Sequence, residues 1–204
     1  MRLSKEIEIE FKSMLTHTEY EALLRYYHVA EDQFVTQTNT YFDTVDFRLK
    51  QEGMGLRIRS FASAAEATLK VPQSVGLLEI TDSLTTTDAE EAISTKQFSA
   101  KATEVLTRLH TLSIQSSDLH MIGKLITKRS EFMIPEGKLA LDESWYSGHH
   151  DFELELEVPD STYGEAEFSQ LLTRLGLTYR KTKNKIERAV NAQLENNKGM
   201  EELK

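Results

Sequence analysis

The chain has 204 residues, of which 39% are hydrophobic and 28% are charged, a composition typical of a globular protein with a sizeable core. It has no cysteine, which excludes disulfides, thiolate metal sites and a cysteine nucleophile. Its formal net charge of −9 argues against broad attraction to nucleic acid or to an anionic membrane, but not against a small anion held in a cleft. The sequence contains no run of about eighteen apolar residues that could span a membrane. The N-terminus lacks the apolar segment of a signal peptide, so we expect a cytoplasmic protein.

The first half of the chain combines strand-like and helix-like segments. Residues 6–12 read EIEIEFK, a period-2 pattern that predicts a strand. Capping patterns that begin at Thr18 and at Thr87 predict two helical regions, the second extending with a break to about Leu109. Further strands are expected at residues 37–43, 56–59, 67–71 and 76–83.

The second half of the chain also combines strand-like and helix-like segments. Residues 152–158 read FELELEV, the clearest alternating strand in the chain. No Pro-, Gly- or Ser-rich linker divides the sequence, so we predict one α+β domain over residues 1–195, followed by a polar tail over 196–204. The other elements expected here are strands at 125–134 and 138–142 and helices at about 163–175 and 183–194.

Charged residues occupy one face of several predicted strands, because residues i and i+2 of a strand share a face. A solvated sheet face would account for any single row. Unmixed carboxylate rows repel one another, however, and a sheet closed with these faces inward would place carboxylates around a cation and basic groups around an anion. The rows are Glu6, Glu8, Glu10 and Lys12; Glu153, Glu155 and Glu157; Arg57 and Arg59; and Lys181, Lys183 and Lys185.

This combination of charges is suited to phosphoryl chemistry. Mg²⁺ and Mn²⁺ prefer oxygen ligands, commonly a few carboxylates together with phosphate oxygens. Arginine binds phosphate through a planar fork, and lysine adds a compact point charge. The sequence contains neither GxxxxGK[ST] nor GxGxxG, so side chains must provide the phosphate contacts.

The region around residues 145–150 offers a weaker signal. His149 and His150 are adjacent, so on an extended segment they would face opposite ways and would not bind one metal ion. Trp145 and Tyr146 precede the acidic strand and would either pack or stack on the ring of an organic substrate. We expect packing.

Several ordered motifs resemble those of the CYTH domain proteins, also called triphosphate tunnel metalloenzymes. Glu8-Ile9-Glu10-Phe11-Lys12 matches the ExExK motif that defines the family. The remaining matches are Tyr41-Phe42-Asp43-Thr44, Leu56-Arg57-Ile58-Arg59, Thr68-Leu69-Lys70, Glu79, Thr127-Lys128-Arg129, Leu141-Asp142, Glu153 to Glu157, and Lys183 with Lys185. The resemblance thus covers most of the chain.

The resemblance implies a closed eight-stranded antiparallel β-barrel, a tunnel lined by the charged faces, with helices packed outside. It also implies a Mg²⁺ or Mn²⁺ cofactor and a small-molecule triphosphate substrate. The residues it assigns to the metal are Glu8, Glu10, Asp142, Glu153 and Glu155. Those it assigns to the substrate are Lys12, Arg57, Arg59, Lys70, Arg129, Lys183 and Lys185, with Glu155, Lys12 and Arg57 in catalytic roles.

Three assignments stay open at the level of sequence. Glu157 is an alternative to Glu153 in the late acidic pair, and Glu6 is expected at the tunnel mouth. Lys128 and Arg129 have opposite parity, so only one of them should point inward, and we favour Arg129.

The leading functional hypothesis is a metal-dependent hydrolase of inorganic triphosphate or of a small organic triphosphate. The alternatives are a class IV adenylate cyclase, which would make cyclic AMP and pyrophosphate from ATP, and a non-catalytic binder of polyphosphate or nucleotides. We expect no nucleic-acid or membrane partner and a monomer or homodimer.

Overall fold

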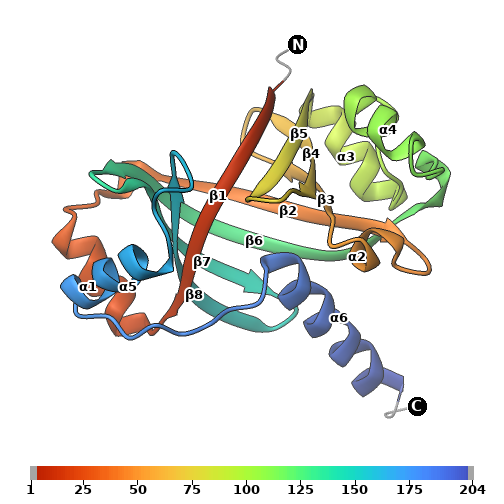
Figure 1. The fold of residues 1–204 in the computed structure, drawn as a ribbon. Helices are drawn as coiled ribbons and strands as arrows, with labels where there is room; N and C mark the ends of the chain where they lie inside the picture. Colours follow the sequence, from red (N-terminus) through yellow and green to blue (C-terminus); the bar gives the residue numbers. More distant parts are fainter. Residues whose placement is uncertain (1–3, 202–204) are drawn as a thin grey trace.

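Eight antiparallel strands close into a barrel in the computed structural model, which describes residues 4–201 (Figure 1). Around the barrel the strands follow the order β1-β5-β4-β3-β2-β6-β7-β8. This confirms the predicted closed barrel. The strands are β1 (Ser4–Leu15), β2 (Phe34–Thr44), β3 (Gly55–Ser60), β4 (Ala65–Pro72), β5 (Leu77–Leu84), β6 (Leu119–Ile134), β7 (Gly137–Tyr146) and β8 (His149–Val158).

The alternation of each strand decides what the barrel encloses. Glu10 and Lys12 of β1 line the tunnel, whereas Phe11 between them packs outside. Lys12 pairs in register with Glu155 of β8, so the two charged rows predicted from sequence run side by side. The barrel interior is therefore charged, and its apolar faces point outward.

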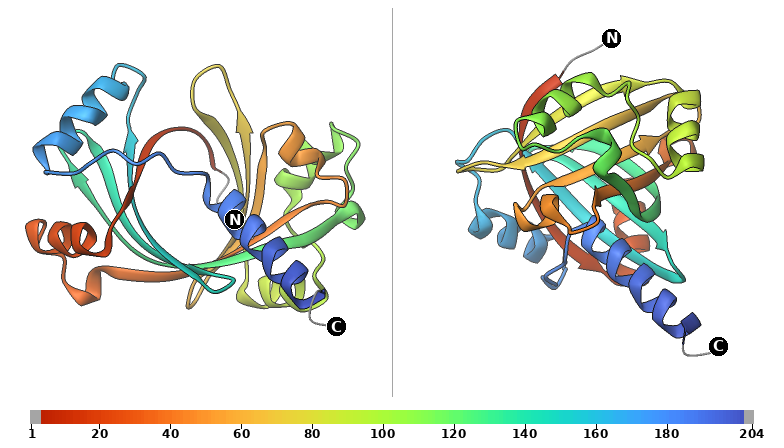
Figure 2. Two further views of the ribbon diagram at one scale, coloured as in Figure 1. Left: turned by 90° about the horizontal axis from the view of Figure 1, so that it is seen from below. Right: turned by 90° about the vertical axis from the view of Figure 1, so that its right-hand side faces the viewer.

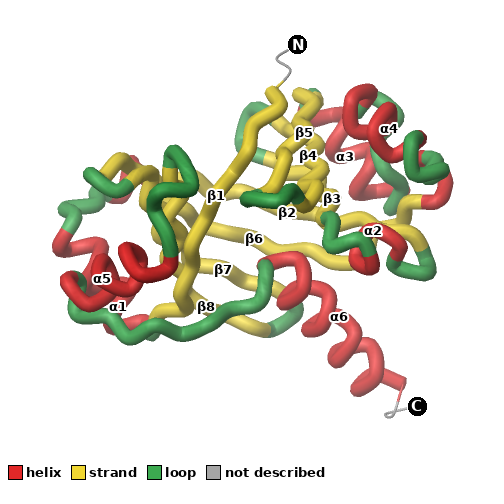
Figure 3. Tube along the Cα trace, viewed as in Figure 1, coloured by secondary structure: helices red, strands yellow, loops and turns green. Residues whose placement is uncertain are grey.

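The helices cover those outward apolar faces, so the hydrophobic core lies between helix and barrel wall rather than inside the barrel (Figures 2 and 3). One cluster joins β7 and β8 to α1 and α5, and another joins β3, β4 and β5 to α3 and α4. The helices are α1 (His17–Tyr26), α2 (Arg48–Gln51), α3 (Thr86–Thr95), α4 (Thr103–His110), α5 (Glu165–Arg174) and α6 (Lys185–Glu201).

Helix α6 packs differently, against residues whose side chains share the tunnel face of β2 and β6. Its Ala189 contacts Tyr41 and Leu125 in a third apolar cluster. Gly123 of β6 lies against α6, where an added Cβ would be in van der Waals contact with Val190 Cγ2 at 3.4 Å. The first turn of α6 consequently lies at the tunnel. No helix within residues 4–201 is long and apolar enough to cross a membrane.

The helix boundaries differ from the predicted ones by small shifts. The first helix is capped by Thr16 with Glu19 rather than from Thr18, because two overlapping matches to the capping pattern occur there. The region 87–109 divides into α3 and α4, with Lys96 in a left-handed conformation at the end of α3. Helix α6 continues to Glu201, so most of the predicted polar tail is helical; residues 202–204 lie outside the described part.

Candidate active site

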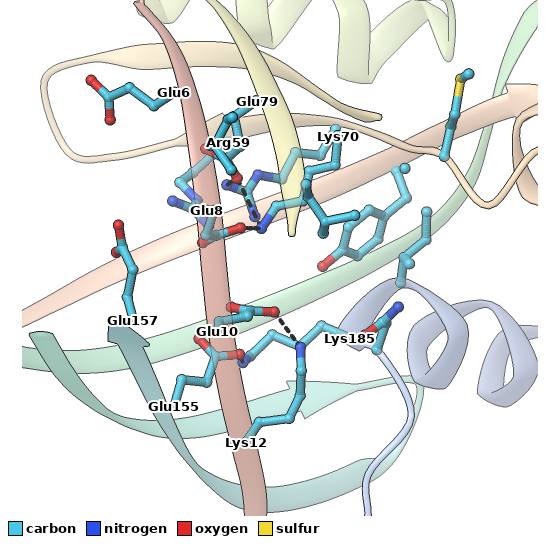
Figure 4. Close-up of a pocket in the computed structure, with 18 of the residues that line it drawn as sticks. Glu6, Glu8, Glu10, Lys12, Arg59, Lys70, Glu79, Glu155, Glu157 and Lys185 are labelled. Carbon is cyan, nitrogen blue, oxygen red and sulfur yellow. Dashed lines mark hydrogen bonds and ion pairs between the residues drawn. The ribbon is translucent and has the colours of Figure 1, made fainter. Parts of the chain in front are cut away.

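The barrel encloses a cavity of about 340 Å³ that is lined mainly by charged side chains (Figure 4). They come from seven of the strands and from the first turn of α6, so positions distant in sequence meet in one tunnel. The charged lining residues are Glu6, Glu8, Glu10, Lys12, Arg57, Arg59, Lys70, Glu79, Arg129, Glu131, Lys138, Glu155, Glu157 and Lys185.

Three buried carboxylates, which we call the acidic cluster, meet at one wall of this tunnel. Asp142, Glu153 and Glu155 each offer an oxygen, and these oxygens all lie within 4.8 Å of one another. Lys185 Nζ is 2.8 Å from Asp142 Oδ2 and 2.6 Å from an oxygen of each glutamate. Arg129 donates two hydrogen bonds to the Asp142 carboxylate, of 2.7 and 2.6 Å, and also contacts Glu155.

These cations keep Asp142 and Glu155 ionised despite their burial. Burial acts to raise the pKa of Glu155, but Lys185 and Arg129 together hold that pKa well below its usual range. The pKa of Asp142 is lowered in the same way, with Arg129 as the main opposing charge. Burial acts to lower the pKa of Lys185, yet the surrounding carboxylates raise it above its ordinary value.

A second group of charges lies along β1. Lys70 contacts Glu8 and lies 2.8 Å from Glu79, while Lys12 contacts its neighbour Glu10 (Figure 4). Burial and the negative charge of Glu10 raise the pKa of Glu8 to about 7. Burial acts in the same direction on Glu79, but Lys70 and Arg57 lower its pKa to about 2. Two glutamates that share one lysine therefore differ strongly in how readily they ionise.

The arginines of β3 provide the least neutralised positive charge among the described residues of the tunnel. Arg57 has Glu79 as its nearest carboxylate, at 3.9 Å, and its buried Nε has no hydrogen-bond partner within the described structure. Arg59 donates a 2.9 Å hydrogen bond to Asn39 and lies 3.4 Å from Glu66. Burial and the charge of Arg57 lower the pKa of Arg59 to about 10, so it stays charged at neutral pH. A guanidinium that faces a cavity, with only a distant carboxylate beside it, is suited to bind an anion.

The structure brings most of the predicted site residues together. Asp142 and Glu153 lie directly behind the tunnel surface, in contact with Lys185. Lys183 does not join them: its side chain is 62% exposed and pairs with Glu187 at 3.0 Å. The residues that line the tunnel as expected are Glu8, Glu10, Lys12, Arg57, Arg59, Lys70, Arg129, Glu155 and Lys185.

The positions left open by the sequence are now placed. Arg129 points inward, whereas Lys128 pairs with the exposed Glu31 at 2.6 Å. Glu153 belongs to the acidic cluster, and Glu157 instead pairs with Lys138 at 2.5 Å. Glu6 also lines the cavity, apart from the ion-paired groups (Figure 4).

Three charged residues near the tunnel escaped the sequence analysis. Glu131 shares the face of Arg129, and Lys138 shares the face of Asp142, so the period of two would have indicated both. Arg188 follows Lys185 by three positions on α6, a spacing that puts both on one helix face. The sequence therefore indicated that Arg188 and Lys185 share a helix face. It did not indicate that this face contacts β8.

The pair His149 and His150 lies at a different place. Together with Trp145 and Tyr146 it lines a separate shallow groove at the end of the β7–β8 hairpin. The His150 ring stacks on Trp145 with centroids 5.0 Å apart and its Nε2 lies 2.9 Å from Glu143. These rings pack against one another and do not line the tunnel.

The acidic cluster has the donor chemistry of a divalent-metal site. Asp142 and Glu153 are fully or almost fully buried, and their oxygens lie close enough to those of Glu155 to share one ion. Glu8 and Glu10 add carboxylates on the tunnel surface. Oxygen-only ligands of this kind favour Mg²⁺ or Mn²⁺ over softer metals.

Comparison with known proteins decides the family. The family model of the CYTH domain matches residues 6–190. The chain belongs to the CYTH family. The resemblance drawn from the ExExK motif and its companions is thereby confirmed.

Relatives of this CYTH protein carry two kinds of name. The Bacillus subtilis (strain 168) protein named "Putative triphosphatase YjbK" is 39% identical over 184 residues, covering 90% of this chain and 94% of that protein. A Bacillus halodurans crystal structure, described as "a putative adenylate cyclase (bh2851)", has a TM-score of 0.83 at 37% identity and covers 90% of this chain and 97% of its own.

A more distant relative shares the fold. The structure of "Putative adenylyl cyclase HpAC1" from Hippeastrum, described as revealing a dominant triphosphatase activity, has a TM-score of 0.66 at 17% identity. It covers 90% of this chain and 94% of its own. At this identity the match establishes the barrel architecture alone.

Lys183 and Lys185 give a direct test of which side chains enter the tunnel. We expect Lys185→Gln to lower kcat/KM for a triphosphate by about a hundredfold or more, because it removes a buried ammonium group from the tunnel. Lys183→Gln removes an exposed partner of Glu187 and should cost less than about threefold. Steady-state kinetics of both variants would check this, and a larger loss for Lys183→Gln would contradict the placement.

Proposed function

We propose that this CYTH protein hydrolyses a triphosphate in a reaction that depends on Mg²⁺ or Mn²⁺. The observation that supports it most is the meeting, in one tunnel, of the acidic cluster and the guanidinium of Arg57, whose nearest carboxylate is 3.9 Å away and whose Nε has no hydrogen-bond partner in the described structure. An anion-binding protein alone would gain nothing from burying three carboxylates beside its basic groups, since they repel the ligand.

The basic residues of the tunnel are assigned to the triphosphate oxygens. Arg57 and Arg59 would grip from β3, Lys70 from β4 and Lys12 from β1, with Arg129 and Lys185 between the substrate and the acidic cluster. Such preorganised positive groups stabilise the charge that develops on the transferred phosphoryl group.

The carboxylates are assigned to the metal and to the water. Asp142, Glu153 and Glu155 would hold the ion together with Glu8 and Glu10. A bound divalent ion supplies Lewis-acid activation of a phosphoryl oxygen and lowers the pKa of bound water. Glu155, the cluster member that lines the tunnel, would orient the attacking water toward the terminal phosphorus, and the P–O–P bond breaks to release phosphate.

The composition of the tunnel favours inorganic triphosphate over an organic one. Tyr41 is the one aromatic residue that lines the described tunnel, and its side chain is almost wholly buried. Trp145 and Tyr146, considered as a stacking platform, lie in the separate hairpin groove. A base or another flat ring would thus have little surface on which to stack.

Adenylate cyclase is the second candidate, because the Bacillus halodurans relative at 37% identity carries that name. It requires recognition of the adenine ring and activation of the ribose 3′-hydroxyl. A non-catalytic polyphosphate binder is the third, and the buried carboxylates argue against it.

A substrate panel with metal titration distinguishes these functions. We expect phosphate release from tripolyphosphate with Mg²⁺ or Mn²⁺, loss of turnover in EDTA, and slower release from thiamine triphosphate and ATP. Cyclic AMP and pyrophosphate as the products from ATP would establish the cyclase instead. Tight tripolyphosphate binding without turnover under any divalent metal would establish the binder.

A further inference from the structure

Arg188 of α6 does not line the tunnel, but its side chain makes several hydrogen bonds and ion pairs beside it. Its side chain is 9% exposed. Its terminal nitrogens donate hydrogen bonds of 3.2 and 2.8 Å to the two oxygens of Glu153, and Nε lies 3.2 Å from Asp151 Oδ2. A guanidinium that engages both oxygens of a carboxylate fixes its orientation as well as its charge.

Arg188 and Lys185 converge on one atom. Both side chains project from the same face of α6, because they are three residues apart. Lys185 Nζ lies 2.6 Å from Glu153 Oε2, and Arg188 donates to that same oxygen at 2.8 Å. Glu153 is 1% exposed, so its position depends on these two partners.

The same arginine also anchors the backbone that leads into α6. Its Nη1, which also faces Glu153, lies 2.9 Å from the carbonyl oxygen of Lys183 and contacts the hydroxyl of Thr182. Residues 177–184 have no regular secondary structure, so these bonds tie an irregular segment to β8 through Glu153. Arg188 thereby links the first turn of α6, which carries Lys185, to β8.

Asp151 extends this contact to the β7–β8 hairpin. Tyr146 donates a 2.5 Å hydrogen bond to Asp151 Oδ2, the oxygen that faces Arg188. Arg188 thus has carboxylate partners on two inward-facing positions of β8, and its pKa is raised by Glu153 against the opposing effect of burial. An arginine between two fixed carboxylates has little freedom to reach the substrate itself.

We propose that Arg188 is a positioning residue: it fixes Glu153 and the start of α6 so that Lys185 points into the tunnel. The proposal rests on the proposed function for the ligand, an inorganic triphosphate. Arg188 affects triphosphate binding through Lys185, so in the absence of metal its loss should matter only while Lys185 is present.

A double-mutant cycle tests this. We expect Arg188→Gln to weaken tripolyphosphate binding about tenfold in EDTA, where no metal-dependent turnover occurs, and to lower kcat/KM in Mg²⁺ by about a hundredfold, mainly through KM. In a Lys185→Gln background the same change should cost less than about twofold. Arg188→Lys should recover part of the loss, since it keeps one charged donor toward Glu153. Arg25→Gln, which removes an exposed helix arginine paired with Glu21, serves as the matched control with unchanged binding.

The outcomes separate a positioning role from a purely structural one. Equal losses in the wild-type and Lys185→Gln backgrounds, or binding by Arg188→Gln within twofold of wild type, would overturn the proposal. Circular dichroism checks folding, and if Arg188→Gln does not fold, Arg188→Lys is measured in the same cycle. Coupling in the binding cycle without any wild-type turnover would uphold the role of Arg188 and refute the hydrolase.

Discussion

Replacing Glu8 with Gln should lower kcat/KM by about a thousandfold and should at the same time stabilise the metal-free protein. The first effect follows because Glu8 is assigned to the metal, whose Lewis-acid role is worth several kcal/mol of transition-state stabilisation. The second follows because burial and Glu10 raise the pKa of Glu8 from 4.5 to about 7, so its ionisation costs folding free energy. We expect a gain on the order of 2–3 kcal/mol at pH 8.

The pH dependence of that gain has a definite sign. Below pH 4.5 Glu8 is protonated in both the folded and the unfolded state, so Gln brings no advantage. The gain should grow between pH 4.5 and 7, where only the unfolded chain ionises freely, and stay constant above. Thermal unfolding of wild type and Glu8→Gln across this range, in EDTA, would measure it.

Glu79→Gln is the matched control, because Glu79 shares Lys70 with Glu8. Lys70 and Arg57 lower the pKa of Glu79 to about 2 against the effect of burial, so its charge stabilises the fold above pH 4.5. The variant should therefore be destabilised at pH 7, and the wild-type advantage should disappear as the pH falls toward 2. Stability changes of the same sign in both variants would refute this electrostatic description, and full turnover by Glu8→Gln would refute its metal role.

Arg57→Gln should lower kcat/KM by about a hundredfold to a thousandfold and should destabilise the protein less than Arg129→Gln. Its one carboxylate neighbour, Glu79 at 3.9 Å, keeps Lys70 as a nearer cation at 2.8 Å, so the removal of Arg57 leaves no buried carboxylate without a counter-charge. It does remove a donor to the developing charge of the phosphoryl group, a loss of about 3–4 kcal/mol in the transition state. Kinetics together with urea unfolding would check both parts.

Arg129→Gln provides the contrast, since it removes an arginine from the same tunnel. Arg129 is bound to Asp142 and Glu155, and its loss leaves both carboxylates with Lys185 as their remaining close cation among the described residues. Breaking a buried pair of this kind costs about 3–5 kcal/mol of folding free energy. If Arg57→Gln proved the more destabilising of the two, the inference that Arg129 forms the stronger ion pairs and Arg57 the weaker one would be wrong.

Much of the fold follows from local patterns in the sequence. The strict alternation of residues 6–12 and 152–158 dictates strands with one charged and one apolar face, and both lie in the barrel as expected. The apolar faces need cover, which the predicted helices supply. Closure of the barrel, in contrast, came from the resemblance of ordered motifs, because alternation alone fits an open sheet with one solvated face equally well.

The candidate site divides in the same way. Parity along a strand is a local property, so the sequence predicted that only one of Lys128 and Arg129 points inward. The structure shows that it is Arg129, the residue we favoured. The choice between Lys183 and Lys185 was beyond it, because both precede or begin a helix whose starting residue determines where each side chain points.

The sequence by itself determined which strand faces are charged and which residues are candidates to bind a triphosphate and a metal. Tertiary structure alone decided how those charges pair: Lys70 bridges Glu8 and Glu79, Arg129 binds Asp142, and Arg57 has Glu79 as its nearest carboxylate only at 3.9 Å. The physical reason is that pairing depends on distances of a few ångströms across strands far apart in sequence, and Coulomb energies and desolvation change steeply over that range. Arg188 belongs to this second class, since nothing local indicates that α6 packs against β8.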